Sequence, residues 1–138
     1  SVNLTTSSGI DVIDLTGVEG NLTLTLGSGD NAVTIDAVTG DITLTTTLGN
    51  DSVTLTNIAG DVILDLGEGN NTVSLINTQA GGDVTVTSGT GVDGIILDNV
   101  AGQSTDTVTL NLGDGANTAS VTTVNGNLEV NGTDGKDS

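Results

Sequence analysis

The residues of this sequence that are best suited to chemistry are aspartates and asparagines that follow closely spaced glycines. The fullest example is the run Gly89-Thr90-Gly91-Val92-Asp93. Glycine lets the backbone curl, so that carbonyl oxygens point into the turn, and aspartate adds a carboxylate. Hard cations prefer such ligands, and Ca²⁺ takes about six to eight oxygens. The turn therefore predicts cation binding.

The same turn recurs along the whole chain, and aspartate and asparagine alternate at its last position. The residues at that position are Asp11, Asn31, Asp51, Asn71, Asp93, Asn117 and Asp137. The glycines whose carbonyl oxygens would complete the ligand sets are Gly27, Gly29, Gly67, Gly69, Gly89, Gly91, Gly113 and Gly115. Alternation gives each pair of neighbouring turns one carboxylate and one amide, and fewer charged ligands mean weaker binding.

A purely structural interpretation of these turns stays open. Glycine, asparagine and aspartate are needed wherever the backbone adopts left-handed conformations, and stacked asparagines form hydrogen-bonded ladders. A second, weaker cation candidate lies at the other turn of the repeat, where aspartates recur after a glycine at Asp41, Asp61 and Asp83. Stacked carboxylates repel one another unless a cation bridges or screens them.

The composition narrows the classes of function. The chain has 138 residues, 18 Asp plus Glu, one Lys or Arg, no His, and a net charge of −17. Nucleic-acid binding needs clustered basic residues, so we expect no nucleic-acid partner, and no apolar run is long enough for membrane insertion. Catalysis would have to rest on Ser, Thr and carboxylates alone, because His, Cys and Tyr are absent. We therefore expect a protein that is not an enzyme.

Internal repetition predicts the fold. A central glycine recurs at Gly9, Gly29, Gly49, Gly69, Gly91, Gly115 and Gly135, at spacings of 20 residues with two longer intervals. Each period holds two strand signals, such as 22–26 and 33–35, separated by turns. Strand, turn, strand, turn in one period is one coil of a solenoid. We predict an all-β, parallel β-solenoid with coils of about 20 residues and two strands per coil.

Alternation along the strands predicts which side chains form the core. One inward column is Leu4, Leu24, Leu44, Leu64, Val86, Leu110 and Val130. The second strand contributes Ile13, Val33, Val53, Val73, Ile95 and Ala119, followed by Leu15, Ile35, Leu55, Leu75, Leu97 and Val121. Extra residues near 79–80 and 103–106 are expected at one and the same turn. Residues 1–138 thus form a single domain of about six or seven coils, which we expect to be a fragment of a longer array.

The turn motif resembles the calcium-binding nonapeptide of RTX (haemolysin-type) β-roll proteins, Gly-Gly-x-Gly-x-Asp-x-apolar-x. This resemblance implies Ca²⁺ as the cofactor, carboxylate ligands from Asp11, Asp51, Asp93 and Asp137, and carbonyl ligands from the turn glycines. The sequence departs from the family because only one turn per coil carries the motif and because leucine, such as Leu26 or Leu66, replaces the first glycine.

Two functions fit a solenoid of this composition. The first is a structural module of a secreted extracellular or cell-surface protein, such as an adhesin stalk, a surface layer or a filament, with calcium ions and end-to-end self-association as its interactions. The alternative is ice binding by outward Thr-x-Thr pairs on one flat face. These pairs are Thr23 and Thr25, Thr43 and Thr45, and Thr85 and Thr87.

Overall fold

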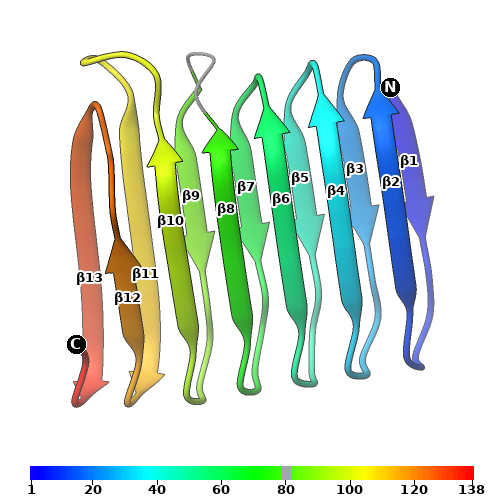
Figure 1. Ribbon diagram of the computed structural model, residues 1–138. Helices are drawn as coiled ribbons and strands as arrows, with labels where there is room; N and C mark the ends of the chain where they lie inside the picture. The colour runs from blue at the N-terminus through cyan, green and yellow to red at the C-terminus, as the bar shows by residue number, and fades with distance from the viewer. Residues whose placement is uncertain (79–81) are drawn as a thin grey trace.

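The computed structural model describes residues 1–78 and 82–138, and it confirms the predicted fold class. The described residues form strands and turns without a helix, and the strands make two parallel sheets (Figure 1). Sheet A has the order β1-β3-β5-β7-β9-β11-β13, and sheet B has the order β12-β10-β8-β6-β4-β2. None of the described residues forms a helix that could cross a membrane.

The strands alternate between the two sheets along the chain, so that each coil contributes one strand to each sheet. Sheet A contains β1 (Val2–Thr5), β3 (Leu22–Thr25), β5 (Ile42–Thr45), β7 (Val62–Asp65), β9 (Val84–Thr87), β11 (Thr107–Gly115) and β13 (Asn127–Gly135). Sheet B contains β2 (Val12–Val18), β4 (Ala32–Val38), β6 (Ser52–Ile58), β8 (Thr72–Thr78), β10 (Gly94–Val100) and β12 (Thr118–Val121).

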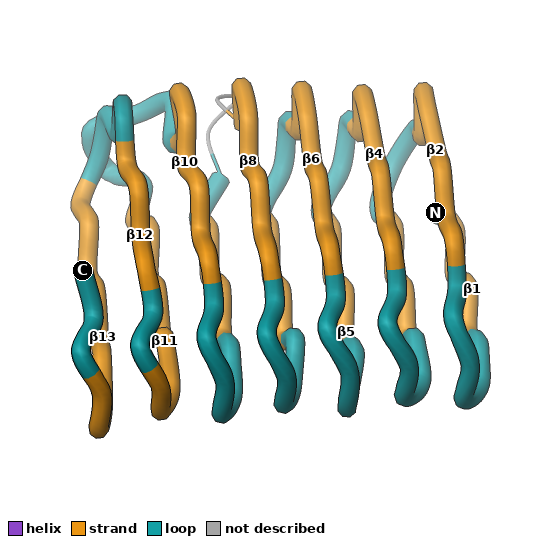
Figure 2. Tube along the Cα trace, turned by 60° about the horizontal axis from the view of Figure 1, so that its bottom comes forward, coloured by secondary structure: helices purple, strands orange, loops and turns teal. Residues whose placement is uncertain are grey.

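Successive coils stack in register, as Figure 2 shows from the turn side. We number them coil 1 (1–19), coil 2 (20–39), coil 3 (40–59), coil 4 (60–78), coil 5 (82–105), coil 6 (106–125) and coil 7 (126–138). Leu24 pairs with Leu44, and Leu44 pairs with Leu64. Because parallel strands repeat at about 4.8 Å, identical side chains lie directly above one another.

The predicted inward columns form the core. Leu24, Leu44 and Leu64 are fully buried, and the aliphatic residues between the two sheets make one continuous cluster. A core without aromatic rings is sufficient here because aliphatic side chains from the two facing sheets fill the narrow coil, as Leu24 and Ile35 do in coil 2. Each coil buries its apolar face against its neighbours rather than against itself.

The second strand of coils 1 to 5 is longer than the sequence pattern predicted, and it contains a local distortion. In coil 2 the pairing register passes from Asp36 directly to Val38, and Ala37 adopts a left-handed conformation with φ of 60°. The distortion turns Val38 inward, out of phase with Val33 and Ile35. The sequence signal was the column Gly17, Ala37, Asn57, Asn77 and Asn99, in which glycine and asparagine tolerate this conformation.

The two longer coils were predicted to carry their extra residues at the same turn. The second insertion lies in the connection between β10 and β11, where Gln103 N–H donates to Asp106 Oδ2 at 2.9 Å and Asp106 N–H donates to Gln103 O at 3.1 Å. The first insertion, at 79–80, lies outside the described residues.

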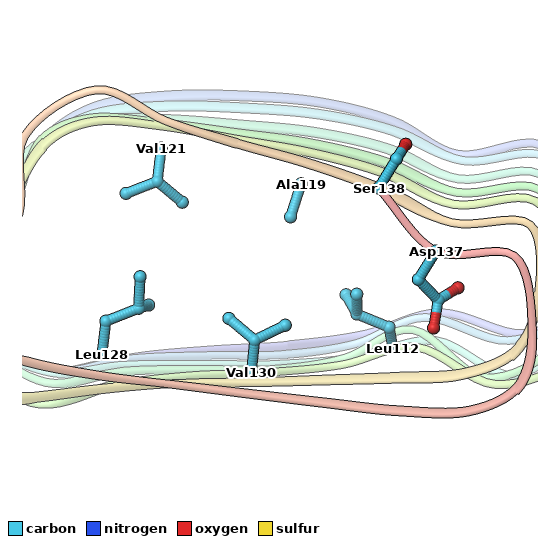
Figure 3. A pocket seen from close by; sticks show the side chains of 7 residues that line it. All are labelled: Leu112, Ala119, Val121, Leu128, Val130, Asp137 and Ser138. Carbon is cyan, nitrogen blue, oxygen red and sulfur yellow. The ribbon is translucent and has the colours of Figure 1, made fainter.

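The end coils have one neighbour each, so their inward residues are only partly covered. Leu4 at one end and Val130 at the other are 36% and 48% exposed, although they belong to columns that are fully buried between them. Figure 3 looks into the coil 7 end, where Ala119 and Val121 of sheet B face Leu128 and Val130 of sheet A across a shallow apolar hollow.

Candidate functional site

The alternating aspartate and asparagine residues form one column inside the solenoid, which we call the inner column. Asn31, Asp51, Asn71, Asp93 and Asn117 are buried, Asp11 is half-buried, and Asp137 in coil 7 is exposed. Burial follows from strand parity, since each of these residues lies two positions before an inward apolar residue such as Val33 or Val53. The column is therefore part of the interior beside the turn.

The inner column is a continuous hydrogen-bonded ladder. The backbone N–H of each member donates to the side-chain oxygen of the member in the next coil. Asn31 N–H donates to Asp51 Oδ1 at 2.9 Å, and Asp51 N–H donates to Asn71 Oδ1 at 3.0 Å. The ladder runs from Asp11 to Asp137 with donor–acceptor distances of 2.8 to 3.1 Å. An oxygen acceptor is all that the ladder requires, and Asp and Asn both supply one.

A second alternation accompanies the first, and it was missed from the sequence. Coils 1, 3 and 5, which carry aspartate, place a hydroxyl residue at the end of the first strand. Coils 2, 4 and 6, which carry asparagine, place leucine there. The hydroxyl residues are Thr6, Thr46 and Ser88, and the leucines are Leu26, Leu66 and Leu112. We call the two kinds aspartate coils and asparagine coils. The signal in the sequence is a period of two coils.

In the asparagine coils the side-chain amide of the inner column finds acceptors. The Asn31 side-chain amide donates to Gly29 O at 2.9 Å and to Asp51 Oδ1 at 2.8 Å. The Asn71 amide donates to Gly69 O at 3.3 Å, and the Asn117 amide donates to Leu112 O at 2.8 Å. An amide hydrogen thus occupies a glycine carbonyl that the sequence proposed as a cation ligand in coils 2 and 4.

The aspartate coils leave oxygen atoms without partners. Among the described residues, the buried side-chain atoms without a hydrogen bond are Asp51 Oδ2, Asp93 Oδ2 and Thr78 Oγ1. In the end coil, by contrast, Thr6 Oγ1 donates to Asp11 Oδ2 at 2.5 Å. In coils 3 and 5 the hydroxyl hydrogen is used elsewhere, since Thr46 Oγ1 donates to Leu66 O at 2.7 Å and Ser88 Oγ donates to Leu112 O at 3.0 Å.

The turn glycines are needed because a side chain there would overlap the backbone of the preceding coil. A Cβ atom on Gly69 would overlap the carbonyl oxygen of Gly49 in the coil before, and φ at Gly69 is +130°. The same overlap with the preceding coil's glycine carbonyl recurs at Gly29, Gly49, Gly91, Gly115 and Gly135. The other turn glycines, Gly27, Gly67, Gly89 and Gly113, likewise lie against backbone of the preceding coil. Side chains are thus excluded wherever coils stack this closely.

The second cation candidate forms a ladder on the surface. Asp41, Asp61 and Asp83 are exposed and stacked at the opposite turn. Asp61 N–H donates to Asp41 Oδ1 at 3.1 Å, and Asp83 N–H donates to Asp61 Oδ1 at 2.9 Å. Backbone amides thus stabilise these carboxylates. Among the described residues, no group of three or more His, Cys, Asp or Glu side chains could hold a metal ion.

A third ladder lies on the outer side of the glycine-rich turn and was not predicted. Asn50 N–H donates to Asp30 Oδ1, Asn70 N–H donates to Asn50 Oδ1, and Val92 N–H donates to Asn70 Oδ1, each at 2.8 Å. The signal was the second Asp or Asn beside the inner-column residue in coils 2, 3 and 4, as in Asp30-Asn31 and Asn70-Asn71. One member of each such pair faces inward and the other faces solvent.

One carboxyl group has a clearly displaced pKa. A hydrogen bond from the Thr133 hydroxyl, followed by one from the Asp134 backbone N–H, holds the pKa of Asp114 below its ordinary value. Both donors favour the charged form of the carboxyl group. Asp114 lies in coil 6 and both donors lie in coil 7, so this contact also joins two coils.

The threonine pairs occupy the outer face of sheet A, but their array is interrupted. Ile63 lies between Thr43 and Thr85, and Asp65 lies between Thr45 and Thr87. Ile63 is 48% exposed. An ice-binding face needs an unbroken, uncharged array, and a thermal-hysteresis assay tests this alternative directly.

Searches against protein-family models, curated proteins and solved structures found no match. The class of the protein therefore rests on its own fold, which is a parallel β-solenoid repeat domain. Its similarity to RTX proteins remains a resemblance of the turn motif.

Proposed function

We propose that this chain is a structural repeat module of a secreted, cell-surface protein, and that it acts as a stiff rod in a stalk, surface layer or filament. The observation that carries the proposal is the unbroken bonding from coil to coil. Both sheets, the inner column and the aliphatic core run along the same axis. Such stacking gives length and stiffness from nearest-neighbour contacts alone.

The surface supports the same proposal. The net charge of −17 keeps neighbouring rods apart and soluble. The absence of cysteine from the sequence fits a secreted protein that folds without disulfide chemistry. The flat faces of both sheets carry mostly short polar side chains, such as Thr23 and Thr34.

Small-angle scattering and limited proteolysis test the rod. Seven first strands spaced about 4.8 Å apart give a stack about 30 Å long. A protease should cut the interior coils no faster than global unfolding allows. A stack of another length, or rapid cutting within the interior coils, would contradict the proposal. Electron microscopy at high protein concentration tests end-to-end self-association, and particles that stay single at every concentration would count against it.

Calcium is the ion that the motif resemblance implies, and we include it in the proposal as the ion that sets rigidity. Calorimetry combined with circular dichroism checks this part separately. Heat of binding and a rise in thermal stability in millimolar calcium are expected. Absence of both would remove calcium while leaving the rod intact.

A further inference from the structure

The two enclosed aspartates of the inner column have no cationic partner. Asp51 and Asp93 are 2% and 1% exposed. The only Lys or Arg of the chain is Lys136, an exposed residue of coil 7. Aspartate is almost never fully buried unless it is paired, because an isolated charge loses its hydration without compensation. The only basic side chain of the sequence thus offers these two carboxylates no countercharge.

One oxygen of each carboxylate is well satisfied and the other is not. Asp51 Oδ1 accepts hydrogen bonds from the backbone N–H and the side-chain amide of Asn31. Asp93 Oδ1 accepts one from the backbone N–H of Asn71. The second oxygen, Oδ2, has no partner in either residue. In an asparagine coil this place holds an amide that donates to neighbouring carbonyl groups, and aspartate has no hydrogen to donate there.

The hydroxyl residue that meets the aspartate in coil 1 donates its hydrogen elsewhere in coils 3 and 5. In coil 1, the hydroxyl of Thr6 lies against Asp11 Oδ2. Thr46 and Ser88 occupy the same place in coils 3 and 5, are buried, and donate their only hydrogen to a carbonyl oxygen of the next coil. The hydroxyl oxygens keep lone pairs that can serve as ligands. In coils 3 and 5 the Oδ2 oxygen of the aspartate therefore receives no hydrogen bond from the hydroxyl residue of its own coil.

We propose that Asp51 and Asp93 each anchor an interior site for a singly charged metal cation such as Na⁺, with the hydroxyl oxygens of Thr46 and Ser88 as further ligands. A hard cation prefers oxygen ligands of these kinds. One carboxylate matches one positive charge, so the occupied site is neutral as a whole. A divalent ion would leave a net positive charge buried in the core, which is costly.

This inference goes beyond the proposed function and assigns to two members of the inner column an ion that the turn motif does not imply. The proposed function is tested separately, by scattering, proteolysis and electron microscopy. The asparagine coils take no ion, because Asn31, Asn71 and Asn117 close the corresponding places with their own amide hydrogens.

The test is urea unfolding of the full chain in NaCl and in choline chloride, mixed to a constant ionic strength. Constant ionic strength is needed because salt alone screens the repulsion among the acidic residues. Once sodium exceeds its dissociation constant, two sites should lower the unfolding constant about fourfold for each doubling of sodium. Asp51→Asn or Asp93→Asn should reduce this to about twofold, and the double variant should abolish it.

Asn is the natural residue at this position of the neighbouring coils, so these variants keep the ladder acceptor, and circular dichroism verifies that they fold. The matched control is Asp30→Asn, which removes an exposed carboxylate from the outer ladder of the same turn, keeps its acceptor oxygen and should retain the full sodium response. Equal stability in both salts, or a sodium response that survives in the double variant, would overturn the inference. If calcium stabilised the protein, sodium did not, and the double variant lost the effect, the bound cation would be divalent and the proposed single charge would be wrong.

Discussion

Asp51 and Asn71 show how two similar side chains do different work at one position of a repeat. Both present an Oδ1 oxygen to the backbone N–H of the coil before, with distances of 2.9 and 3.0 Å. They differ only in the second side-chain atom, which donates hydrogen in Asn71 and cannot in Asp51. The ladder therefore accounts for the choice of Asp or Asn over other residues. It does not account for their alternation, which the hydroxyl and leucine partners explain.

Glycine substitutions separate the two reasons for glycine at the turn, which are the missing Cβ atom and the tolerance of a positive φ. Gly69→Ala adds a Cβ that overlaps the Gly49 carbonyl at a positive φ, Gly9→Ala meets only the unfavourable φ, and Gly94→Ala meets neither. We expect a loss of about 3 kcal/mol or more for Gly69→Ala, about 1 kcal/mol for Gly9→Ala, and little change or a gain for Gly94→Ala. Equilibrium unfolding in urea measures all three. Similar losses at Gly69 and Gly94 would contradict the steric role.

At the scale of the strands, the periodic sequence was sufficient to predict the architecture. Leu24, Leu44 and Leu64 recur every 20 residues, and a one-residue slip would expose all of them. The distortion at Ala37 could not be predicted from alternation, because a left-handed residue shifts the phase of everything after it. The second strand therefore buries Val38, a position that strict alternation assigns to solvent.

The fate of the site residues could be predicted only in part. The turn motif placed Asp51 and Asn71 in one column, but it did not indicate whether their side chains bind ions or one another. That outcome depends on the coil spacing, which brings each backbone N–H within hydrogen-bonding distance of the next coil's side chain. The partner Thr46 was missed because it looks like an ordinary exposed strand residue unless two coils are compared with the next two.

Core substitutions should reveal how burial grows toward the middle of the stack. Leu44→Ala removes a fully buried side chain packed between two coils, whereas Leu4→Ala removes one that is 36% exposed in coil 1. We expect losses of about 2–5 kcal/mol for Leu44→Ala and of about 1 kcal/mol for Leu4→Ala. Thermal or urea unfolding measures both, and equal losses would indicate that coil 1 is capped by something other than solvent.

At the scale of the whole molecule, stability should be distributed unevenly. Interior coils have two neighbours and the end coils have one, so opening should begin at the ends. We expect amide hydrogen exchange to be slowest for β5, β6 and β7 and fastest for β1 and β13. Mass spectrometry of exchanged peptides measures this gradient. Uniform exchange along the chain would indicate that all coils open together.

The inner ladder runs in the direction opposite to that of the outer ladder and of the ladder at the other turn. In coil 3, Asp51 accepts from the coil before it, whereas Asn50 and Asp41 accept from the coil after it. Adjacent side chains of one coil therefore form hydrogen bonds to different neighbours, one to the coil before and one to the coil after. At the junctions between coils 2 and 5, loss of a single side chain leaves two ladders in place, so no junction there depends on one side-chain hydrogen bond.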